Sequence, residues 1–207
     1  MSWLSEAANR LGMRGVLVHD VRFAATSFVA SVKVDEAERA RRRDAGLGAV
    51  VSHELLEVLA VLPHGHPVDW NELDPVSAAV LDLAPDGVVA RTPRSVERLW
   101  RPAITLEGVL VIDTNPSEGL DAASLFAPDA ARALILERLE EPPAWVEREA
   151  QELGVGLAVI ANDRFDVKVR PQPSPAAPSS PRHWRLRETI YANWLLPEAY
   201  SSAHVSK

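Results

Sequence analysis

The sequence predicts an α/β protein, with α+β as the alternative, built on a small mixed sheet. An apolar segment (131–136), an amphipathic helix started by two prolines (144–153) and an apolar strand (155–160) follow one another near the C-terminus. This order is typical of a βαβ unit. Residues 131–136 also fit a helix, which would leave only an α/β hairpin. More strands are predicted by runs of apolar and β-branched residues at 16–18, 28–34, 104–113 and 165–170, the last as a half-exposed edge.

Helices are predicted where apolar residues recur at helical spacing, most of them behind a capping residue. Ser52 precedes the clearest one, and Asp74-Pro75 begins another because proline at the first helical position costs no hydrogen bond. Asp35 is the expected cap of a charged helix, whose Arg41-Arg42-Arg43 run is interpreted as a solvated face. Asn115-Pro-Ser-Glu-Gly119 is expected to be a loop. The predicted helices span residues 2–12, 36–44, 51–62 and 74–83.

The middle segment, residues 49–101, resembles a winged helix at the level of the fold. It offers a helix, a short extended piece at His66–Val68, a second helical piece and two short strands around Thr92-Pro-Arg-Ser95. Only Asp69–Leu73 is available for the middle helix of that arrangement. Two alternatives stay open: residues 93–101 form a helix capped by Thr92, or the whole segment decorates a single sheet.

A proline-rich segment near the end of the chain separates an α/β body from a C-terminal arm. Five prolines in residues 171–181 predict an extended spacer, which gives a body at 1–171, a linker at 172–181 and an arm at 182–207. The arm carries an apolar stripe at helical spacing that a short helix cannot leave uncovered. The expected partner-binding residues are Trp184, Leu186, Ile190, Tyr191, Trp194 and Leu195. The stripe packs on its own body, on a second copy or on another protein.

Composition and charge narrow the classes of function. The chain has no cysteine, so disulfides, thiol nucleophiles and iron–sulfur ligation are excluded. Nineteen arginines against three lysines suggest a GC-rich bacterial genome, and the N-terminus does not look like a signal peptide, so a cytoplasmic protein is expected. The net charge is −7, and residues 1–181 alone carry −9, which disfavours DNA binding through phosphate contacts. No membrane partner is expected.

Four arginines are candidates for binding a nucleic acid or another anion. They recur every three or four residues within an acidic body, and guanidinium groups suit phosphate or carboxylate partners. The alternative is that they pair with neighbouring acids such as Asp82, Asp86 and Glu97. The candidates are Arg91, Arg94, Arg98 and Arg101.

Two groups of residues resemble metal-site motifs, and both depart from them. His64-Gly-His66-Pro-Val-Asp69 resembles the HxHxDH motif of metallo-β-lactamase-fold hydrolases, but the acid falls one position late and Trp70 replaces the closing histidine. Asp20 and Asp113 end predicted strands, as the acids of metal-dependent nucleases do, yet the chain contains no Glu-x-Lys. No cofactor motif is present, and none is expected to bind.

We therefore expect a non-enzymatic bacterial regulatory or accessory protein, with enzyme activity left uncertain. It would act by binding protein, or DNA as a weaker possibility, and would use the arm for docking or self-association. The alternative is a metal-dependent hydrolase or nuclease with a non-standard site built from His64, His66, Asp69, Asp20 or Asp113.

Overall fold

The computed structural model describes residues 3–138, 141–161, 164–174 and 180–203, with the side chains of the last range described up to Leu195. The chain divides into two compact units, each built from two stretches of sequence. The first unit comprises Met1–Lys33 and Leu106–Ala177, and the second comprises Val34–Thr105 and Pro178–Lys207. This division differs from the expected body and separate arm, because residues 182–207 belong to the same unit as residues 34–105. The expected linker at 172–181 lies partly outside the described residues.

The predicted α/β class is confirmed. Among the described residues there are seven α-helices, a six-stranded mixed sheet in the order β1-β2-β6-β7-β8-β9 and a three-stranded sheet. Antiparallel pairing joins β1 to β2 and β8 to β9, whereas β6, β7 and β8 are parallel. The strands of the larger sheet are β1 Val16–Phe23, β2 Thr26–Val34, β6 Ile104–Asp113, β7 Ala131–Glu137, β8 Gly156–Ala161 and β9 Arg164–Val169.

The predicted βαβ unit is present, and the helical alternative for residues 131–136 is wrong. β7 and β8 are parallel neighbours joined by α6 (Ala144–Leu153), which ends at Gly154 in the left-handed conformation. β7 is buried along almost its whole length, as expected of a central strand covered on both faces. β9 pairs with β8 on one side only and alternates in exposure, as predicted for an edge.

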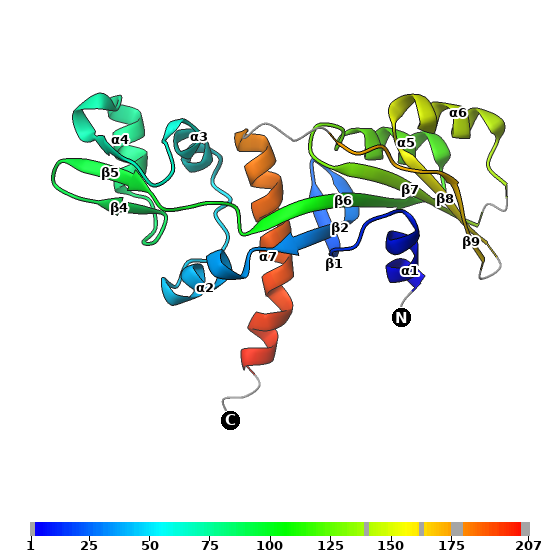
Figure 1. The fold of residues 1–207 in the computed structure, drawn as a ribbon, viewed down its shortest axis with the longest axis horizontal. Coiled ribbons are helices and arrows are strands. Elements are labelled where there is room, and N and C mark those ends of the chain that lie inside the picture. Colours follow the sequence, from blue (N-terminus) through cyan, green and yellow to red (C-terminus); the bar gives the residue numbers. More distant parts are fainter. Residues whose placement is uncertain (1–2, 139–140, 162–163, 175–179, 204–207) are drawn as a thin grey trace. The chain divides into compact units, whose positions relative to one another are not determined.

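Helices cover both faces of the six-stranded sheet (Figure 1). α1 (Trp3–Arg10) lies against one face, and α5 (Pro116–Ser124) and α6 lie against the other. Ala7 and Ala8 of α1 share a core with Leu110 and Ile135 of the sheet. On the opposite face, Phe28 of β2 contacts Phe126, with the ring centroids 4.6 Å apart.

The loop expected at residues 115–119 is instead the beginning of α5. The side chain of Asn115 accepts a hydrogen bond from the N–H of Ser117 (3.1 Å), and Pro116 occupies the first helical turn. Gly119 lies within the helix at a point where a Cβ atom would stand 2.4 Å from a methyl group of Leu134. The glycine therefore allows close packing of the helix on the sheet.

The second unit combines three α-helices and one 3-10 helix with a small antiparallel sheet, together with α7 near the end of the chain. The sheet has the order β3-β5-β4, and β4 and β5 form a hairpin, so the alternative helix at 93–101 is wrong. The expected caps Asp35, Ser52 and Asp74 each accept a backbone N–H at the start of their helices. The elements are α2 Glu36–Asp44, α3 His53–Val61, β3 Pro67–Asp69, the 3-10 helix η1 Trp70–Glu72, α4 Pro75–Asp82, β4 Val89–Arg91, β5 Ser95–Arg98 and α7 Pro181–Ala203.

The core of the second unit is centred on α3. Leu56 and Leu59 of this helix are fully buried, and Trp100 and Trp184 belong to the same apolar cluster. The rings of the two tryptophans are 4.9 Å apart, which joins α7 to the segment after β5. The C-terminal helix is thus part of this core.

The hairpin of β1 and β2 turns without glycine or asparagine. Phe23 pairs with Thr26, so only Ala24 and Ala25 form the turn, and their φ angles are 49° and 65°. Two positive φ angles in a two-residue hairpin loop indicate a type I′ turn, which favours Asn-Gly. Alanine adopts this left-handed region only with strain.

We expect the combined change Ala24→Asn and Ala25→Gly to stabilise the first unit by about 1 kcal/mol, because the new residues accept positive φ with less strain. Hydrogen exchange of the β1 and β2 amides measures the gain. The control is Ala127→Gly, a turn position of the same unit without positive φ, where glycine should give no gain. If the turn variant and Ala127→Gly changed the stability of the first unit equally, the strain assigned to Ala24 and Ala25 would be contradicted.

Candidate functional site

The four candidate arginines do not form a common binding patch. Arg91 donates to the carbonyl oxygen of Leu81 at 2.8 and 3.0 Å and also to that of Ala84. Arg98 donates to the carbonyl oxygen of Leu59 at 2.6 Å. These contacts hold the β4–β5 sheet against α3 and α4.

The other two arginines differ from each other. Arg101 is exposed, but it pairs with Asp35 at 3.1 Å and lies 3.5 Å from Glu38, so acids of its own unit neutralise its charge. Arg94 is exposed in the turn between β4 and β5. Of the four, Arg94 is therefore the one placed to meet an anion in solution.

The metal candidates of the sequence have separate structural roles. Asp69 accepts hydrogen bonds from the backbone and side-chain nitrogens of Asn71, both at 2.9 Å, and thereby caps η1. The Nδ1 atom of His66 lies 3.1 Å from the carbonyl oxygen of His64. Among the described residues, no three His, Cys, Asp or Glu side chains are grouped so that they could hold a metal ion.

The two strand-end aspartates are also used locally. Asp113 accepts the N–H groups of Thr114 (2.7 Å) and Asn115 (2.9 Å), which turns the chain from β6 into α5. Asp20 has a φ of 54° where the pairing of β1 with β2 shifts register. Both residues shape the backbone at the points where they occur.

The apolar stripe of the predicted arm lies on α7 and is largely buried. Leu186 and Ile190 are fully buried, Trp184 and Tyr191 nearly so, and Trp194 and Leu195 are partly exposed. A partner could reach the first four side chains only if α7 left its own packing. None of the helices in the described part of the chain has the length and apolar character that crossing a bilayer requires.

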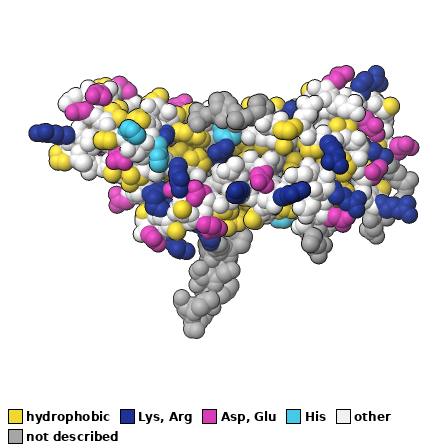
Figure 2. Space-filling view, viewed as in Figure 1, with side chains coloured by type: hydrophobic (Ala, Val, Ile, Leu, Met, Phe, Trp, Pro, Cys, Tyr) yellow, Lys and Arg dark blue, Asp and Glu magenta, His cyan; other side chains and the backbone are white. Residues whose placement is uncertain are grey.

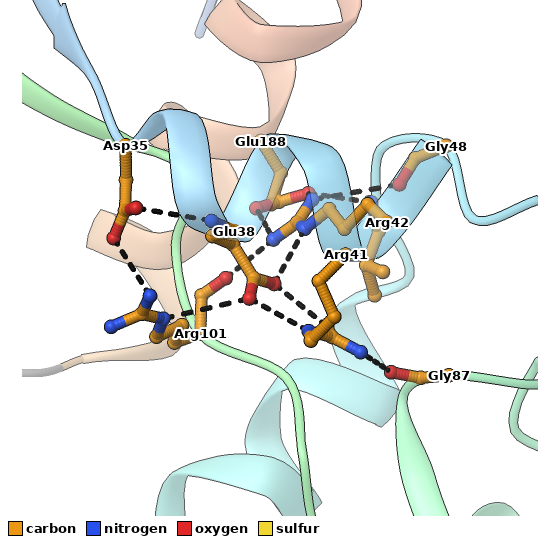
Figure 3. Close-up of polar contacts among 9 residues, drawn as sticks. Asp35, Glu38, Arg41, Arg42, Gly48, Gly87, Arg101 and Glu188 are labelled. Carbon is orange, nitrogen blue, oxygen red and sulfur yellow. Dashed lines mark hydrogen bonds and ion pairs between the residues drawn. The ribbon is translucent and has the colours of Figure 1, made fainter. Parts of the chain in front are cut away.

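A buried ion pair attaches α7 to α2 (Figure 3). Both side chains have no exposed surface, and the Arg42 guanidinium donates to the two carboxylate oxygens of Glu188, each at 2.8 Å. Arg42 also donates to Glu38 (2.9 Å) and to the carbonyl oxygens of Gly48 (3.5 Å) and Arg101 (2.5 Å). All five N–H donors of this guanidinium are therefore used. Burial of Arg42 corrects the solvated face expected for residues 41–43, of which only Arg43 is exposed.

The cluster extends on both sides of Arg42. Glu188 also accepts the backbone N–H of Val50 at 2.7 Å, so α7 holds the loop that leads into α3. Glu38 accepts two hydrogen bonds from Arg41 (2.7 and 2.8 Å), which in turn donates to the carbonyl oxygen of Gly87 at 2.8 Å. Arg41 and Arg42 of α2 thus contact four other parts of the second unit (Figure 3). These are α7 at Glu188 and the segments at Gly48, Gly87 and Arg101.

The acids of the cluster respond to this environment in opposite directions. Burial raises the pKa of Glu188 above its ordinary value, and the hydrogen bonds from Arg42 and Val50 only reduce the rise. Burial acts on Glu38 in the same direction, but the hydrogen bonds and charges of Arg41 and Arg42 outweigh it and hold its pKa below the ordinary value. For Arg42, burial is likewise outweighed by its two acidic partners, which raise the pKa and keep the side chain charged.

The exposed face of α4 is a surface that the sequence analysis did not single out. Val76 is 72% exposed and Leu83, just after the helix, is 84% exposed, while Asp74 and Asp82 lie beside them in the sequence. In the region of α4, Figure 2 shows acidic and hydrophobic side chains side by side at the surface. Asp44–Ala90 contains eight acidic residues and no lysine or arginine. This run of acidic residues without lysine or arginine is the feature of the sequence from which the surface could have been predicted.

Comparison with protein-family models, with curated proteins and with solved structures gave no significant match for this chain. The function is therefore argued from the surface and charge of the second unit.

We expect Glu188→Leu to destabilise the second unit by about 3–5 kcal/mol, because it removes both oxygen acceptors and leaves Arg42 buried without this partner. Urea unfolding followed by tryptophan fluorescence measures the loss, since Trp70, Trp100, Trp184 and Trp194 all lie in this unit.

The matched control is Arg43→Gln on the same helix, whose side chain is 72% exposed and which should change stability by less than about 0.5 kcal/mol. The double change Arg42→Met with Glu188→Leu should cost less than the sum of its single changes. Equal losses in Glu188→Leu and Arg43→Gln would show that the ion pair does not hold the helix.

We also expect the second unit to lose stability in acid, because protonation of Glu38 removes its pairing with Arg41 and Arg42. Its folded pKa lies below the ordinary 4.5, so the stabilisation is present above that pH and is lost as the pH falls below it. In the Glu38→Gln variant, the free energy of unfolding should therefore decrease less between about pH 5 and pH 3 than in the wild type. Urea unfolding at a series of pH values gives both curves.

Glu188 acts with the opposite sign, because its folded pKa is raised. Its contribution to stability is lost as the pH rises from 4.5 through the folded pKa, and this decline should persist in the Glu38→Gln variant. If the free energy of unfolding fell equally in the wild type and in Glu38→Gln between about pH 5 and pH 3, the role given to Glu38 would be contradicted.

Proposed function

We propose that this chain is a non-enzymatic regulatory or accessory protein whose second unit binds a protein partner through a winged-helix-like module. The observation that carries the proposal is the face of α4, which exposes Val76 and Leu83 within a segment that has acidic residues and no lysine or arginine. The bacterial, cytoplasmic setting expected from the composition is part of the same proposal.

The order of elements supports the winged-helix-like module. Helix α3 is followed by β3, the single turn η1, α4 and then the β4–β5 hairpin. The hairpin strand β5 lies between β3 and β4, so the first strand pairs with the last. In this arrangement η1 takes the place of the middle helix, α4 corresponds to the recognition helix, and the hairpin corresponds to the wing.

The charge of the module argues against DNA as its main partner. A recognition helix enters the major groove between two phosphate backbones, and neutralising those phosphates requires lysine and arginine. Asp44–Ala90 offers eight acids and neither of these cations. Arg94 at the hairpin turn supplies one exposed cation, while Arg91 and Arg98 donate to backbone carbonyls within the unit.

The exposed apolar residues of α4 favour a protein partner. Large aliphatic side chains that are mostly exposed gain free energy when a partner removes them from water. Val76 and Leu83 lie in and just after one short helix, so a single partner can cover both.

We expect the purified protein to show no saturable binding to labelled duplex DNA at about 50 mM salt, where phosphate contacts are strong. In cross-linking mass spectrometry with extracts of the cells that make it, the wild type should capture a protein partner through peptides near α4. Val76→Asp should abolish this capture, because a carboxylate then replaces a buried methyl contact.

The control variant is Val61→Asp, which changes another valine of the second unit that is 75% exposed but lies on α3. It should leave capture intact. Saturable DNA binding that Arg94→Glu abolishes would overturn the proposal and support DNA recognition by the hairpin.

A further inference from the structure

An open apolar groove lies beside the exposed face of α4, entirely within the second unit. Its volume is about 430 Å³. One wall comes from the loop before α3 and from the first turn of that helix, and the other comes from the end of α4. The main apolar side chains of the groove are Val51, Leu55, Val80, Leu83 and Pro85.

The groove is incompletely covered by its own protein. Val51 is 49% exposed and Leu83 is 84% exposed, one on each wall. Leu55 is buried and belongs to the core of the unit, so the floor is held by regular packing. The floor is also anchored through Val50, whose N–H is bonded to the buried Glu188. Such a site is preformed and offers apolar surface to a ligand.

The charges around the groove are predominantly negative. Glu54 lines it, and Asp82 and Asp86 flank the wall residues Leu83 and Pro85 in the sequence; Asp86 is fully exposed and lies 3.9 Å from Arg91. A hydrogen bond from the hydroxyl of Ser52 and the backbone N–H of Glu54 itself hold the pKa of Glu54 below its ordinary value, so its carboxylate is charged at neutral pH. Arg185 of α7 also acts electrostatically on Glu54.

We infer that this groove binds a basic amphipathic helix of a partner protein, which inserts apolar side chains between Val51 and Leu83 and places lysine or arginine beside the acids of the rim. The inference rests on the proposed protein-binding function and specifies its partner. An apolar groove that holds the apolar face of a helix is a recurrent mode of peptide recognition. The acidic rim selects the sign of the partner's charge.

A helix fits the openness of the groove better than a small molecule does. Sites for small ligands enclose most of the ligand surface. Here one wall ends in a leucine with most of its surface in water, so a small apolar ligand would stay partly exposed. A helix covers that leucine from outside while one or two of its side chains enter the groove.

The test uses the full chain and a fluorescein-labelled 18-residue helical peptide of leucine, alanine and lysine, with leucine at i and i+4. Fluorescence anisotropy should show saturable binding that weakens with salt. The double change Val51→Ser and Leu83→Ser should weaken it roughly ten- to a hundredfold, because it removes most of the apolar area that the peptide covers. Both residues are exposed, so the variant should fold.

The matched control is Val61→Ser, since Val61 is 75% exposed on α3 but does not line the groove. Its affinity for the peptide should equal that of the wild type. The double change Asp82→Asn and Asp86→Asn should weaken binding at low salt and reduce its salt dependence. A peptide with glutamate in place of lysine should not bind.

The inference would be overturned by no binding at millimolar peptide, by equal binding of the glutamate peptide, or by equal weakening in Val61→Ser. A wild-type dimer that the groove variant converts to monomer, measured by light scattering, would also overturn it, because a second copy would then occupy the groove. If cellular capture is lost in Val76→Asp while the lysine peptide does not bind, the proposed function stands and the groove fails. If the peptide binds at the groove while DNA is the captured ligand, the proposed function fails.

Discussion

The second unit depends on one buried ion pair, Arg42 with Glu188. The two residues are 146 positions apart, and their bidentate contact joins the first helix of the unit to the last. Isolated charges with no exposed surface are costly, so this pair is tolerated because all five guanidinium donors and both carboxylate oxygens are used. Removing one partner leaves the other charge buried without compensation. Because Glu188 lies on α7, the ion pair holds this helix in place, and Trp184 and Tyr191 of the helix pack in the interior of the unit.

The same pair also shapes the surface of the unit. Glu188 holds the N–H of Val50, which is the residue before Val51 in the wall of the apolar groove. The C-terminal helix thus holds the loop that forms one wall of the groove, while most of its own apolar stripe packs inside the second unit. The arm was expected to bind a partner through its apolar stripe, whereas the mostly or half-exposed aliphatic residues in the described part of the second unit lie in or beside α3 and α4, namely Val51, Val61, Val76 and Leu83.

Local signals predicted much of the fold, and long-range contacts account for what was missed. Ser52 and Asp74 predicted their helices because a cap acts within three residues. Asn115-Pro116 carries the same signal as Asp74-Pro75, but Gly119 made it look like a loop. The role of that glycine depends on Leu134 in a neighbouring strand. The Ala24-Ala25 turn lacks the residues that mark a hairpin. Arg42 was expected on a solvated helix face, and no local pattern shows that it pairs with Glu188, 146 residues away. The candidate site was missed for the same reason, since its walls meet only in the fold.

Topology and surface chemistry give different information about this protein. The order helix, strand, turn, helix and hairpin is shared by modules that read DNA, and on topology alone the hairpin arginines would be assigned to phosphates. The contacts argue otherwise, because Arg91 and Arg98 donate to carbonyl oxygens that close the small sheet against its helices. Each arginine committed to an internal carbonyl is unavailable to a phosphate. The exposed residues in and after α4 include aliphatic side chains with carboxylates close by in the sequence, and this chemistry is the basis for proposing an apolar, positively charged partner.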